Sequence, residues 1–470
     1  MEQTTTKKKI KWEMPHSFLV IGAILLVATI MTWLIPAGEY DRVFDEATGR
    51  DIVLAGSYHA VAQNPVGPFK MFQSILSGLM DASDIIFFGM ISYGYMVLLI
   101  HVGALNAGVA SLIRLVKGKD IFIIPILIFV FSLMGASFGM YEEAYGFIPV
   151  VMGIFISLGY DGLLGVVIVM GSVATGYAAA FVNPYTTAIA QSIAGLPLFS
   201  GLGFRIACYV VFVGAFAIFC MRYALKVRKD PKKSYVYGDD FSHISTSNRD
   251  ELMNTPMTKK AAASLLVFLG SIVLFVWGAL TYGWYFNEIS AIFIICMFIV
   301  GFINGMGPSE ICRTVAEIFK DILLASLLIG IARAILVVLQ EGCVVDSVVY
   351  YLSAGLSHFS KTGAACAMIV IQNLINFFVP SGSGQAVTSM PIMVPLADTL
   401  NINRQIAVVA FQFGDGFSNM FWPTQAAIDC AIGGIALHKW YKFFAPLFVV
   451  FLVLEFVMMI IACAINLGPF

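Results

Sequence analysis

Residues 373–385 read NLINFFVPSGSGQ and are the most informative part of the sequence about its fold. They place two asparagines, a proline, two serines and two glycines in the middle of an apolar segment that spans residues 362–400. About 20 apolar residues cross the hydrocarbon core of a bilayer, so this segment is too long for one crossing and too short for two. Polar, non-helical backbone at that depth is tolerated only where protein buries it or where it lines a wet cavity. The segment therefore predicts a re-entrant hairpin whose tip lies at mid-membrane.

The composition of the 470 residues indicates a membrane protein. Hydrophobic residues make up 59% of the chain and charged residues 12%, which is about half the charge content of soluble domains. The net charge of −1 gives no electrostatic support for binding nucleic acid. The eight cysteines are scattered without CxxC or metal-ligand spacing, which indicates small core residues. A soluble enzyme and a nucleic-acid-binding protein are therefore excluded.

Apolar segments and basic residues predict a multi-pass protein of the inner (plasma) membrane with a cytoplasmic N-terminus, where Lys7–Lys11 form a basic cluster. A second hairpin is expected at about 121–159, and two interrupted helices at about 162–194 and 405–436. This map places twenty Lys and Arg residues inside and five outside, as the positive-inside rule requires. The predicted full crossings are 16–36, 84–106, 202–223, 261–282, 288–306, 321–340 and 443–466. Amphipathic stretches predict either interfacial helices or the flanks of crossings at 67–82, 308–320 and 345–359.

Paired motifs indicate that the two halves of the chain repeat. Gly67-Pro68 recurs as Gly307-Pro308, and Asp84-Ile85 recurs as Asp321-Ile322. Three further pairs keep nearly the same offset, namely Gly103 with Gly342, Pro149 with Pro391 and Pro184 with Pro423. Because the crossing at 261–282 is additional, the second repeat is expected to be inverted, as in secondary transporters. The predicted units are residues 1–227, a cytoplasmic linker at 228–260, and residues 261–470, in an all-α polytopic fold.

The two hairpin tips and the two helix interruptions form the candidate substrate site. Glycines permit unwound turns, and proline can begin the following half-helix. Half-helix N-termini offer free N–H groups and a positive dipole end to a carboxylate, while freed carbonyls and hydroxyls can hold a cation. The alternative interpretation is that these stretches are ordinary surface turns without a role in binding. The predicted substrate-binding residues are Glu142, Glu143, Asn183, Thr186, Asn376, Ser381, Ser383, Gln385, Asp415, Asn419 and Thr424.

Charged side chains within membrane segments point to the substrate, because they are costly there and face cavities or partners. Glu142, Glu143 and Asp415 give the predicted site an excess of acids, which suits a cationic substrate or a proton. Arg333 either binds a substrate carboxylate or forms a structural ion pair with one of these acids. Adjacent residues on a helix diverge by about 100°, so only one of Glu142 and Glu143 is expected to face the substrate. Structural roles are expected for His101, Asp429 and Glu455.

Four motifs carry a family resemblance: MPHSF (14–18) with IPAGEY (35–40), GIARAIL (330–336) with LQEG (339–342), NFFVPSGSGQ (376–385) and FQFGDGFSN (411–419). Over nearly its whole length the chain resembles the YfcC / DcuC-type carriers of the ion transporter superfamily. The resemblance implies inverted repeats, a homodimeric scaffold and an elevator-type transport domain that holds the hairpins and broken helices. It also implies either basic amino-acid antiport or C4-dicarboxylate transport. The chain departs from the family at Tyr141, where the resemblance implies a small residue, so pocket shape and substrate can differ.

The sequence therefore predicts a secondary active transporter of a small amino acid, with arginine/ornithine-type exchange by alternating access as the leading hypothesis. The alternative is a carrier of C4-dicarboxylates or other small carboxylates, coupled to Na⁺ or H⁺. No cofactor or metal is expected apart from such a coupling ion, and the expected partners are substrate, membrane lipid and a second copy of the chain. A channel would need a continuous pore. An enzyme is not expected, because no GxSxG or HExxH pattern occurs.

Overall fold

The computed structural model describes residues 17–46, 50–115, 120–241, 255–282, 284 and 286–468, and these are mostly helical. The basic cluster at Lys7–Lys11 and the middle of the predicted linker, residues 242–254, lie outside the described residues. In the described part, six helices are long and apolar enough to cross a membrane. Many of their large apolar side chains are exposed, which suits contact with lipid tails rather than with water. The chain is therefore a multi-pass membrane protein, which confirms that part of the prediction.

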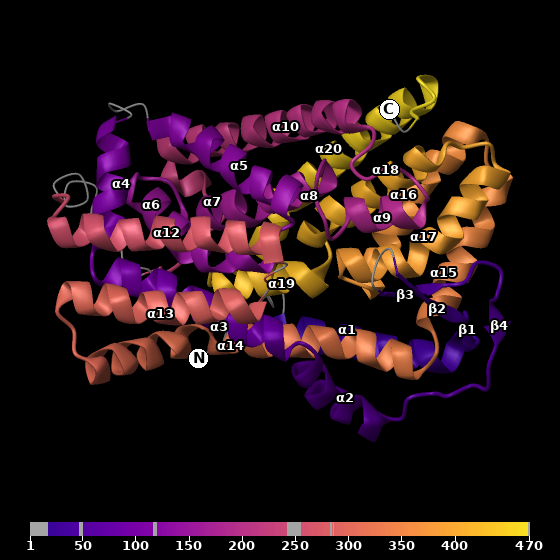
Figure 1. Cartoon of the computed structure of the whole chain (residues 1–470), viewed down its shortest axis with the longest axis horizontal. Coiled ribbons are helices and arrows are strands. Elements are labelled where there is room, and N and C mark those ends of the chain that lie inside the picture. The colour runs from indigo at the N-terminus through magenta and orange to yellow at the C-terminus, as the bar shows by residue number, and fades with distance from the viewer. Residues whose placement is uncertain are drawn as a thin grey trace, which may run out of the picture.

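The helices pack as two groups that lie against each other (Figure 1). Helix α14 is the centre of the first group, because α1, α2, α3 and α13 all pack against it. We call this first set the flanking group, and most of it runs along the lower side of Figure 1. It consists of α1 (Ser17–Leu34), α2 (Pro68–Asp81), α3 (Ser83–His101), α12 (Lys259–Tyr282), α13 (Phe286–Asn304) and α14 (Pro308–Glu341). Helices α4 (Ala104–Leu115) and α15 (Val345–Ala354), the latter followed by η6 (Gly355–His358), lead from it into the second group.

The second group, which we call the hairpin group, contains two helical hairpins, two interrupted helices and two long helices. The first hairpin is built from η1 (Asp120–Phe122), α5 (Ile123–Leu133), the π-helical turn η2 (Met134–Phe138), η3 (Glu142–Phe147) and α6 (Ile148–Ser157). The second hairpin is α16 (Lys361–Phe378) with α17 (Gly382–Thr399). The first interrupted helix comprises α7 (Gly162–Val166), η4 (Val167–Gly171), α8 (Ser172–Ala178) and α9 (Thr187–Ile193). The second comprises α18 (Arg404–Gly416), η7 (Phe417–Met420) and α19 (Pro423–Ile432). The long helices are α10 (Leu202–Lys229), followed by η5 (Pro231–Lys233), and α20 (Leu437–Ala464).

The two interrupted helices meet where each one breaks. A Cβ atom added to Gly416, the last residue of α18, would lie 2.8 Å from the Cβ of Ala178, the last residue of α8. Only glycine permits this approach without displacing one of the two helices. Pro423 then begins α19 at a position where the missing N–H leaves no hydrogen bond unmade. The points at which the two interrupted helices break therefore lie side by side in the hairpin group.

One amphipathic stretch is not a separate helix. Residues 308–320 and the crossing predicted at 321–340 form the single helix α14, whereas α2 ends at Asp81 and α3 begins at Ser83. The difference follows from the local sequence. Asp81, Ser83 and Asp84 flank the break, and such side chains compete for backbone hydrogen bonds and favour helix ends. At the matching place α14 has Phe, Lys and Ile around one aspartate, so the helix continues.

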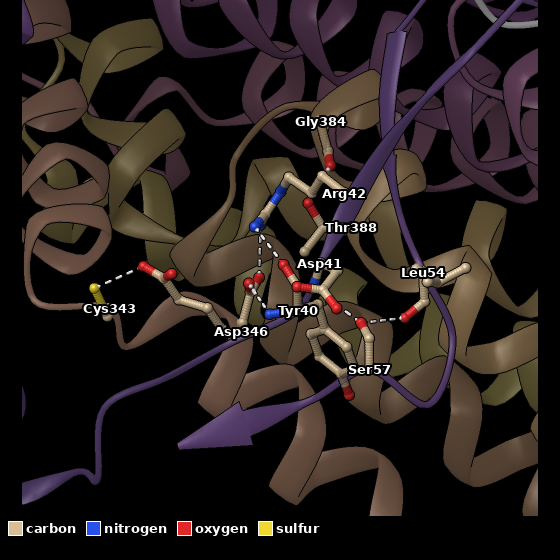
Figure 2. A network of polar contacts seen from close by, with 10 residues as sticks. Tyr40, Asp41, Arg42, Leu54, Ser57, Cys343, Asp346, Gly384 and Thr388 are labelled. Atoms are coloured by element: carbon tan, nitrogen blue, oxygen red, sulfur yellow. Dashed lines mark hydrogen bonds and ion pairs between the residues drawn. The ribbon is translucent and has the colours of Figure 1, made fainter. Parts of the chain in front are cut away.

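The expectation of an all-α fold is incomplete, because residues 38–60 form two small antiparallel sheets. Strand β1 (Gly38–Glu39) pairs with β4 (His59–Ala60), and β2 (Arg42–Asp45) pairs with β3 (Arg50–Val53). We call residues 38–60 with these two sheets the ribbon. Figure 2 shows how the ribbon is anchored to α15: the buried Asp346 accepts hydrogen bonds from the Tyr40 N–H at 3.0 Å and from Arg42 Nη2 at 2.8 Å. On its other side the ribbon packs on α17. Short strands of this kind carry too weak a periodic pattern to be separated from a loop by sequence alone.

Candidate substrate site

A cavity of about 330 Å³ lies between the flanking group and the hairpin group. From the flanking group, Asp84 and Ile85 of α3, Phe286 of α13 and Arg333 of α14 line it. The hairpin group contributes residues from both hairpin tips and both interruptions: Gly139, Tyr141, Glu142, Tyr177, Tyr185, Thr186, Pro380, Ser381, Gly382, Ser383, Asp415, Asn419 and Gln425. Four polar stretches that are far apart in the sequence therefore meet at one cavity.

The tip of the first hairpin turns at Gly139 and directs Glu142 to the cavity. Gly139 has a φ of +68°, a left-handed conformation that glycine adopts without strain. After the turn, η3 orients the two adjacent glutamates differently. Glu142 lines the cavity, whereas Glu143 is buried and accepts a hydrogen bond from the Tyr141 N–H at 2.9 Å. Only Glu142 of the pair is therefore in position to contact a bound solute.

Asn183 organises the interruption of the first broken helix. Its Nδ2 donates to the Gly135 carbonyl oxygen at 3.0 Å, and its Oδ1 accepts from the N–H groups of Tyr185 at 2.9 Å and Thr186 at 3.1 Å. An asparagine that accepts from the backbone N–H groups two and three residues further along replaces a backbone turn. Asn183 is fully buried behind the cavity wall, and Thr186 lines the cavity itself. Asn183 therefore shapes the wall rather than contacting the solute.

The first turn of α17 forms the adjoining part of the wall. Ser381 caps this helix by accepting a hydrogen bond at 3.3 Å from the backbone N–H three residues on. A Cβ atom on Gly382 would lie 2.6 Å from Thr186 Cγ2 and 3.0 Å from Asp415 Oδ2. The missing side chain lets the first N–H groups of α17 approach the cavity together with Ser383. The positive end of the helix dipole and these N–H groups can bind a carboxylate.

Asp415 lines the cavity and is 1% exposed. Asn376 Nδ2 donates to its Oδ1 at 2.9 Å and also to Gln385 Oε1 at 3.2 Å. Gln385 in turn donates to the Oε1 of Gln372 at 2.7 Å. Asn376 and Gln385 are both fully buried, so they position Asp415 instead of lining the cavity. Asn419 lines the cavity and donates Nδ2 to the Asp415 carbonyl oxygen at 2.8 Å.

The structure places Thr424 behind the wall and its neighbour Gln425 on the wall. Thr424 is 2% exposed, and its Oγ1 has no hydrogen-bond partner among the described residues. Gln425 lines the cavity and donates Nε2 to Tyr145 OH at 2.7 Å and to Asp429 Oδ1 at 3.2 Å. Neighbours on α19 point about 100° apart, and sequence alone did not reveal the rotation of this helix. The amide of Gln425 connects the cavity to the buried carboxyl of Asp429.

Two further groups that support or line the site were not selected from the sequence. Asp84 is an acid in the first turn of an apolar helix, the same signal that drew attention to Arg333, and it lines the cavity. Arg205 is 3% exposed and donates Nη1 to Gln412 Oε1 at 3.0 Å. Gln412 Nε2 donates in turn to Thr186 Oγ1 at 3.1 Å. Arg205 thereby orients an amide that joins the two interrupted helices behind the cavity.

The charge balance of the cavity is acidic. Asp84 is solvent-exposed, Glu142 is partly buried and Asp415 is buried, so three carboxylates lie at three depths. Arg333 also lines the cavity, but its guanidinium forms an ion pair with Asp81 at the end of α2. The predicted ion pair between Arg333 and a site acid is therefore wrong in its partner, because folding brings the end of α2 against the middle of α14. Within the described residues, no cluster of His, Cys, Asp and Glu is suited to bind a metal ion.

A cavity between two helix groups, lined by helical hairpins and interrupted helices in a multi-pass fold, is the architecture of a membrane transporter. The chain belongs to the DcuC family, described as the C4-dicarboxylate anaerobic carrier, which it matches over residues 14–464. The family is one of carriers, in agreement with the prediction that the chain is not an enzyme.

Two relatives match the chain at nearly full length. The chain is 31% identical to YfcC of Escherichia coli (strain K12), which carries the provisional name basic amino acid antiporter, over 94% of this chain and 95% of that protein. It is 29% identical to an uncharacterized protein of Haemophilus influenzae over the same shares of each chain. Among solved structures, the YdaH transporter of Alcanivorax borkumensis is 16% identical, with a TM-score of 0.46 over 97% of this chain and all of that one.

Proposed function

We propose that this protein is a secondary active transporter that exchanges small basic amino acids of the arginine and ornithine type by alternating access. The observation that carries the proposal is the acidic cavity between the two helix groups. Asp84, Glu142 and Asp415 line it, and the positive charge of Arg333 is already paired with Asp81. A solute that brings a positive side chain compensates these carboxylates, whereas an uncompensated anion would be repelled.

The other walls suit the remaining groups of an amino acid. The N–H groups at the start of α17 and the hydroxyls of Ser381 and Ser383 can donate to the substrate carboxylate. The rings of Tyr141 and Tyr177 both line the cavity, with centroids 5.4 Å apart and planes at 86°. A guanidinium or ammonium group is attracted to such aromatic faces. The provisional name of the YfcC relative agrees with this substrate class.

A carrier of C4-dicarboxylates or other small carboxylates, coupled to Na⁺ or H⁺, is the second candidate. The family description favours it, and so do the start of α17 and Arg333, which could bind one carboxylate each. In that case Glu142 and Asp415 would bind the coupling cation instead of the substrate. The two candidates therefore assign the same acids to different ligands.

Transport by purified protein in liposomes separates them. Vesicles loaded with unlabelled ornithine are expected to accumulate labelled arginine by saturable counterflow without a Na⁺ gradient. Succinate uptake that requires a Na⁺ or H⁺ gradient, with no arginine counterflow, would replace the proposal by its alternative. Flux of both solutes without saturation or counterflow would indicate a channel.

The proposal includes a movement and an assembly. We propose that the two halves of the chain are inverted repeats, that the hairpin group moves against the flanking group in an elevator-type motion, and that the protein is a homodimer with a cytoplasmic N-terminus. The cavity lies at the boundary between the two groups, so movement along this boundary would expose it to each side in turn. Cysteine labelling at Asn401 from the outside and mass determination in detergent test the topology and the dimer.

A further inference from the structure

We propose that Asp84 is a specificity-determining residue, which together with Glu142 binds the side-chain cation of the transported amino acid. The inference rests on the proposed function and adds the residue that distinguishes a basic amino acid from a neutral one. Asp84 stands at the start of α3 in the flanking group, and Glu142 stands in η3 of the hairpin group. A cation between them would therefore join the two groups across the cavity.

Both carboxylates are available to a ligand. Within the part of the chain that the structure describes, neither forms an ion pair, and the side chain of Asp84 accepts only the N–H of Ile85, at 2.9 Å. Arg333 lines the same cavity but is held by Asp81. Two carboxylates facing one cavity repel each other, and a cation placed between them relieves that repulsion. The planar guanidinium of arginine can donate to both, because it offers five N–H groups in a fixed fork.

An unsatisfied hydroxyl gives independent support for a polar ligand at this place. Tyr141 lines the cavity and is 6% exposed, yet its OH forms no hydrogen bond with any described residue. Buried polar groups in folded proteins are almost always hydrogen-bonded. Because Tyr141 and Glu142 both line this cavity, a ligand held by Glu142 can also accept a hydrogen bond from this hydroxyl. The site is therefore incomplete at the part of the wall that carries Tyr141 and Glu142.

The second half of the chain supplies a matched control. Asp84-Ile85 recurs as Asp321-Ile322, and both aspartates are solvent-exposed. Asp84 follows the break between α2 and α3, whereas Asp321 lies inside the continuous helix α14 and does not line the cavity. The same residue in the same short motif thus occurs once at the site and once away from it. A general effect of removing an acid from an apolar helix would appear at both positions, and an effect on specificity only at Asp84.

Binding of L-arginine and L-citrulline tests the proposal, because citrulline has the length of arginine and an uncharged end group. Purified wild type, Asp84→Asn and Asp321→Asn are compared by isothermal titration in detergent and by counterflow in liposomes. Asp84→Asn is expected to lower the affinity for arginine by about 10- to 100-fold, the range of a lost charge-assisted hydrogen bond. Its affinity for citrulline should stay within about 2-fold of wild type. Asp321→Asn should keep the wild-type ratio of the two affinities.

The outcomes distinguish this proposal from the function on which it rests. If Asp84→Asn keeps the wild-type ratio while Glu142→Gln abolishes arginine binding, Asp84 is not a specificity residue and the carrier function stands. If the wild type binds neither arginine nor ornithine but takes up succinate, both proposals fall. If Asp84→Asn does not fold, Asp84→Glu provides the test. The longer side chain should favour the shorter ornithine over arginine relative to wild type, and an unchanged preference would contradict the role of Asp84.

Discussion

Gly414→Ala tests whether the second interrupted helix must lie in backbone contact with the second hairpin. Gly414 is in the last turn of α18, one residue before Asp415. A Cβ atom there would lie 2.5 Å from Gln372 Cβ, 2.7 Å from the Ile369 carbonyl oxygen and 2.8 Å from the Asn373 N, all on α16. Because two of these three atoms belong to backbone, no side-chain rotation can make room. The substitution therefore has to push α18 away from α16.

The size of this displacement sets the expected cost. Ordinary contacts begin at 3.4 Å, so the helices have to separate by about 0.6 to 0.9 Å, the shortfall at Asn373 and Gln372. Overpacking of this kind costs about 1–3 kcal/mol. Alanine stabilises a helix by about 1 kcal/mol relative to glycine, which offsets part of this cost. The same shift would lengthen the 2.9 Å hydrogen bond from Asn376 to Asp415, which costs about 1.5–3 kcal/mol if it is lost. We expect a net loss of about 1.5–5 kcal/mol if this hydrogen bond is lost.

The assay is the thermal midpoint of unfolding in detergent, together with arginine counterflow. Gly214→Ala is the matched control, because Gly214 lies within α10 and a Cβ atom there would meet nothing within 4 Å. Alanine at this position should leave Tm unchanged or raise it, whereas Gly414→Ala should lower both Tm and counterflow. Equal Tm values for the two variants, with counterflow intact in both, would show that the close approach of α18 and α16 is not required.

Three other outcomes are expected. Glu142→Gln and Asp415→Asn, each checked for folding by size-exclusion chromatography, should lower arginine counterflow at least ~10-fold by removing a cavity carboxylate; full activity in both would show that the site lies elsewhere. Arg42→Ala leaves the buried Asp346 without its cation and should lower the free energy of unfolding by about 1 kcal/mol, since the half-exposed arginine is partly screened; an unchanged Tm would mean that the ribbon is not anchored by this pair. Burial raises the pKa of Asp161 at the turn before α7. The carboxyl of Asp161 therefore holds its proton more tightly in the folded chain than in the unfolded chain. The stability that results is present in acid and is lost as pH rises through the folded pKa. As pH rises from about 4, the ordinary pKa of aspartate, through the raised pKa of the folded chain, the Tm of the wild type should therefore fall relative to that of Asp161→Asn, and parallel Tm curves would contradict this.

The hairpins and interruptions were predictable because their signals are local. Apolar length limits how many crossings a segment can make, and glycine and proline break helices through their own backbone geometry. Residues 123–157 and 361–399 are indeed helix pairs with the polar tips between them. Seven of the twelve residues singled out for substrate or ion-pair roles line the cavity, namely Glu142, Thr186, Arg333, Ser381, Ser383, Asp415 and Asn419. The other five are buried just behind it. Four of them, Glu143, Asn183, Asn376 and Gln385, form hydrogen bonds that hold the wall, whereas Thr424 Oγ1 has no partner among the described residues.

The partners of these residues were not predictable, because each partner comes from a distant part of the chain. Arg333 pairs with Asp81, 252 residues away, and the contact depends on glycine at position 78, where an added Cβ atom would fall 2.5 Å from the Ala334 N. Gln412 looks like one more polar residue near a break, and only the fold shows that it joins Arg205 to Thr186. The strands at residues 38–60 are too short for a periodic signal, and contacts with α15 and α17 position them.

Three features of the sequence already require a membrane protein with polar stretches inside its apolar segments: the length of these segments, the spacing of glycine and proline, and the placement of basic residues. The physical reason is that the bilayer penalises unsatisfied backbone groups and misplaced charges. Neither motif predicts which of the two aspartates, Asp84 or Asp321, lines the cavity. That choice follows from a helix that ends at Asp81 in one half and continues through residue 321 in the other. Side-chain direction depends on how whole helices pack, and packing energies are summed over contacts between segments hundreds of residues apart.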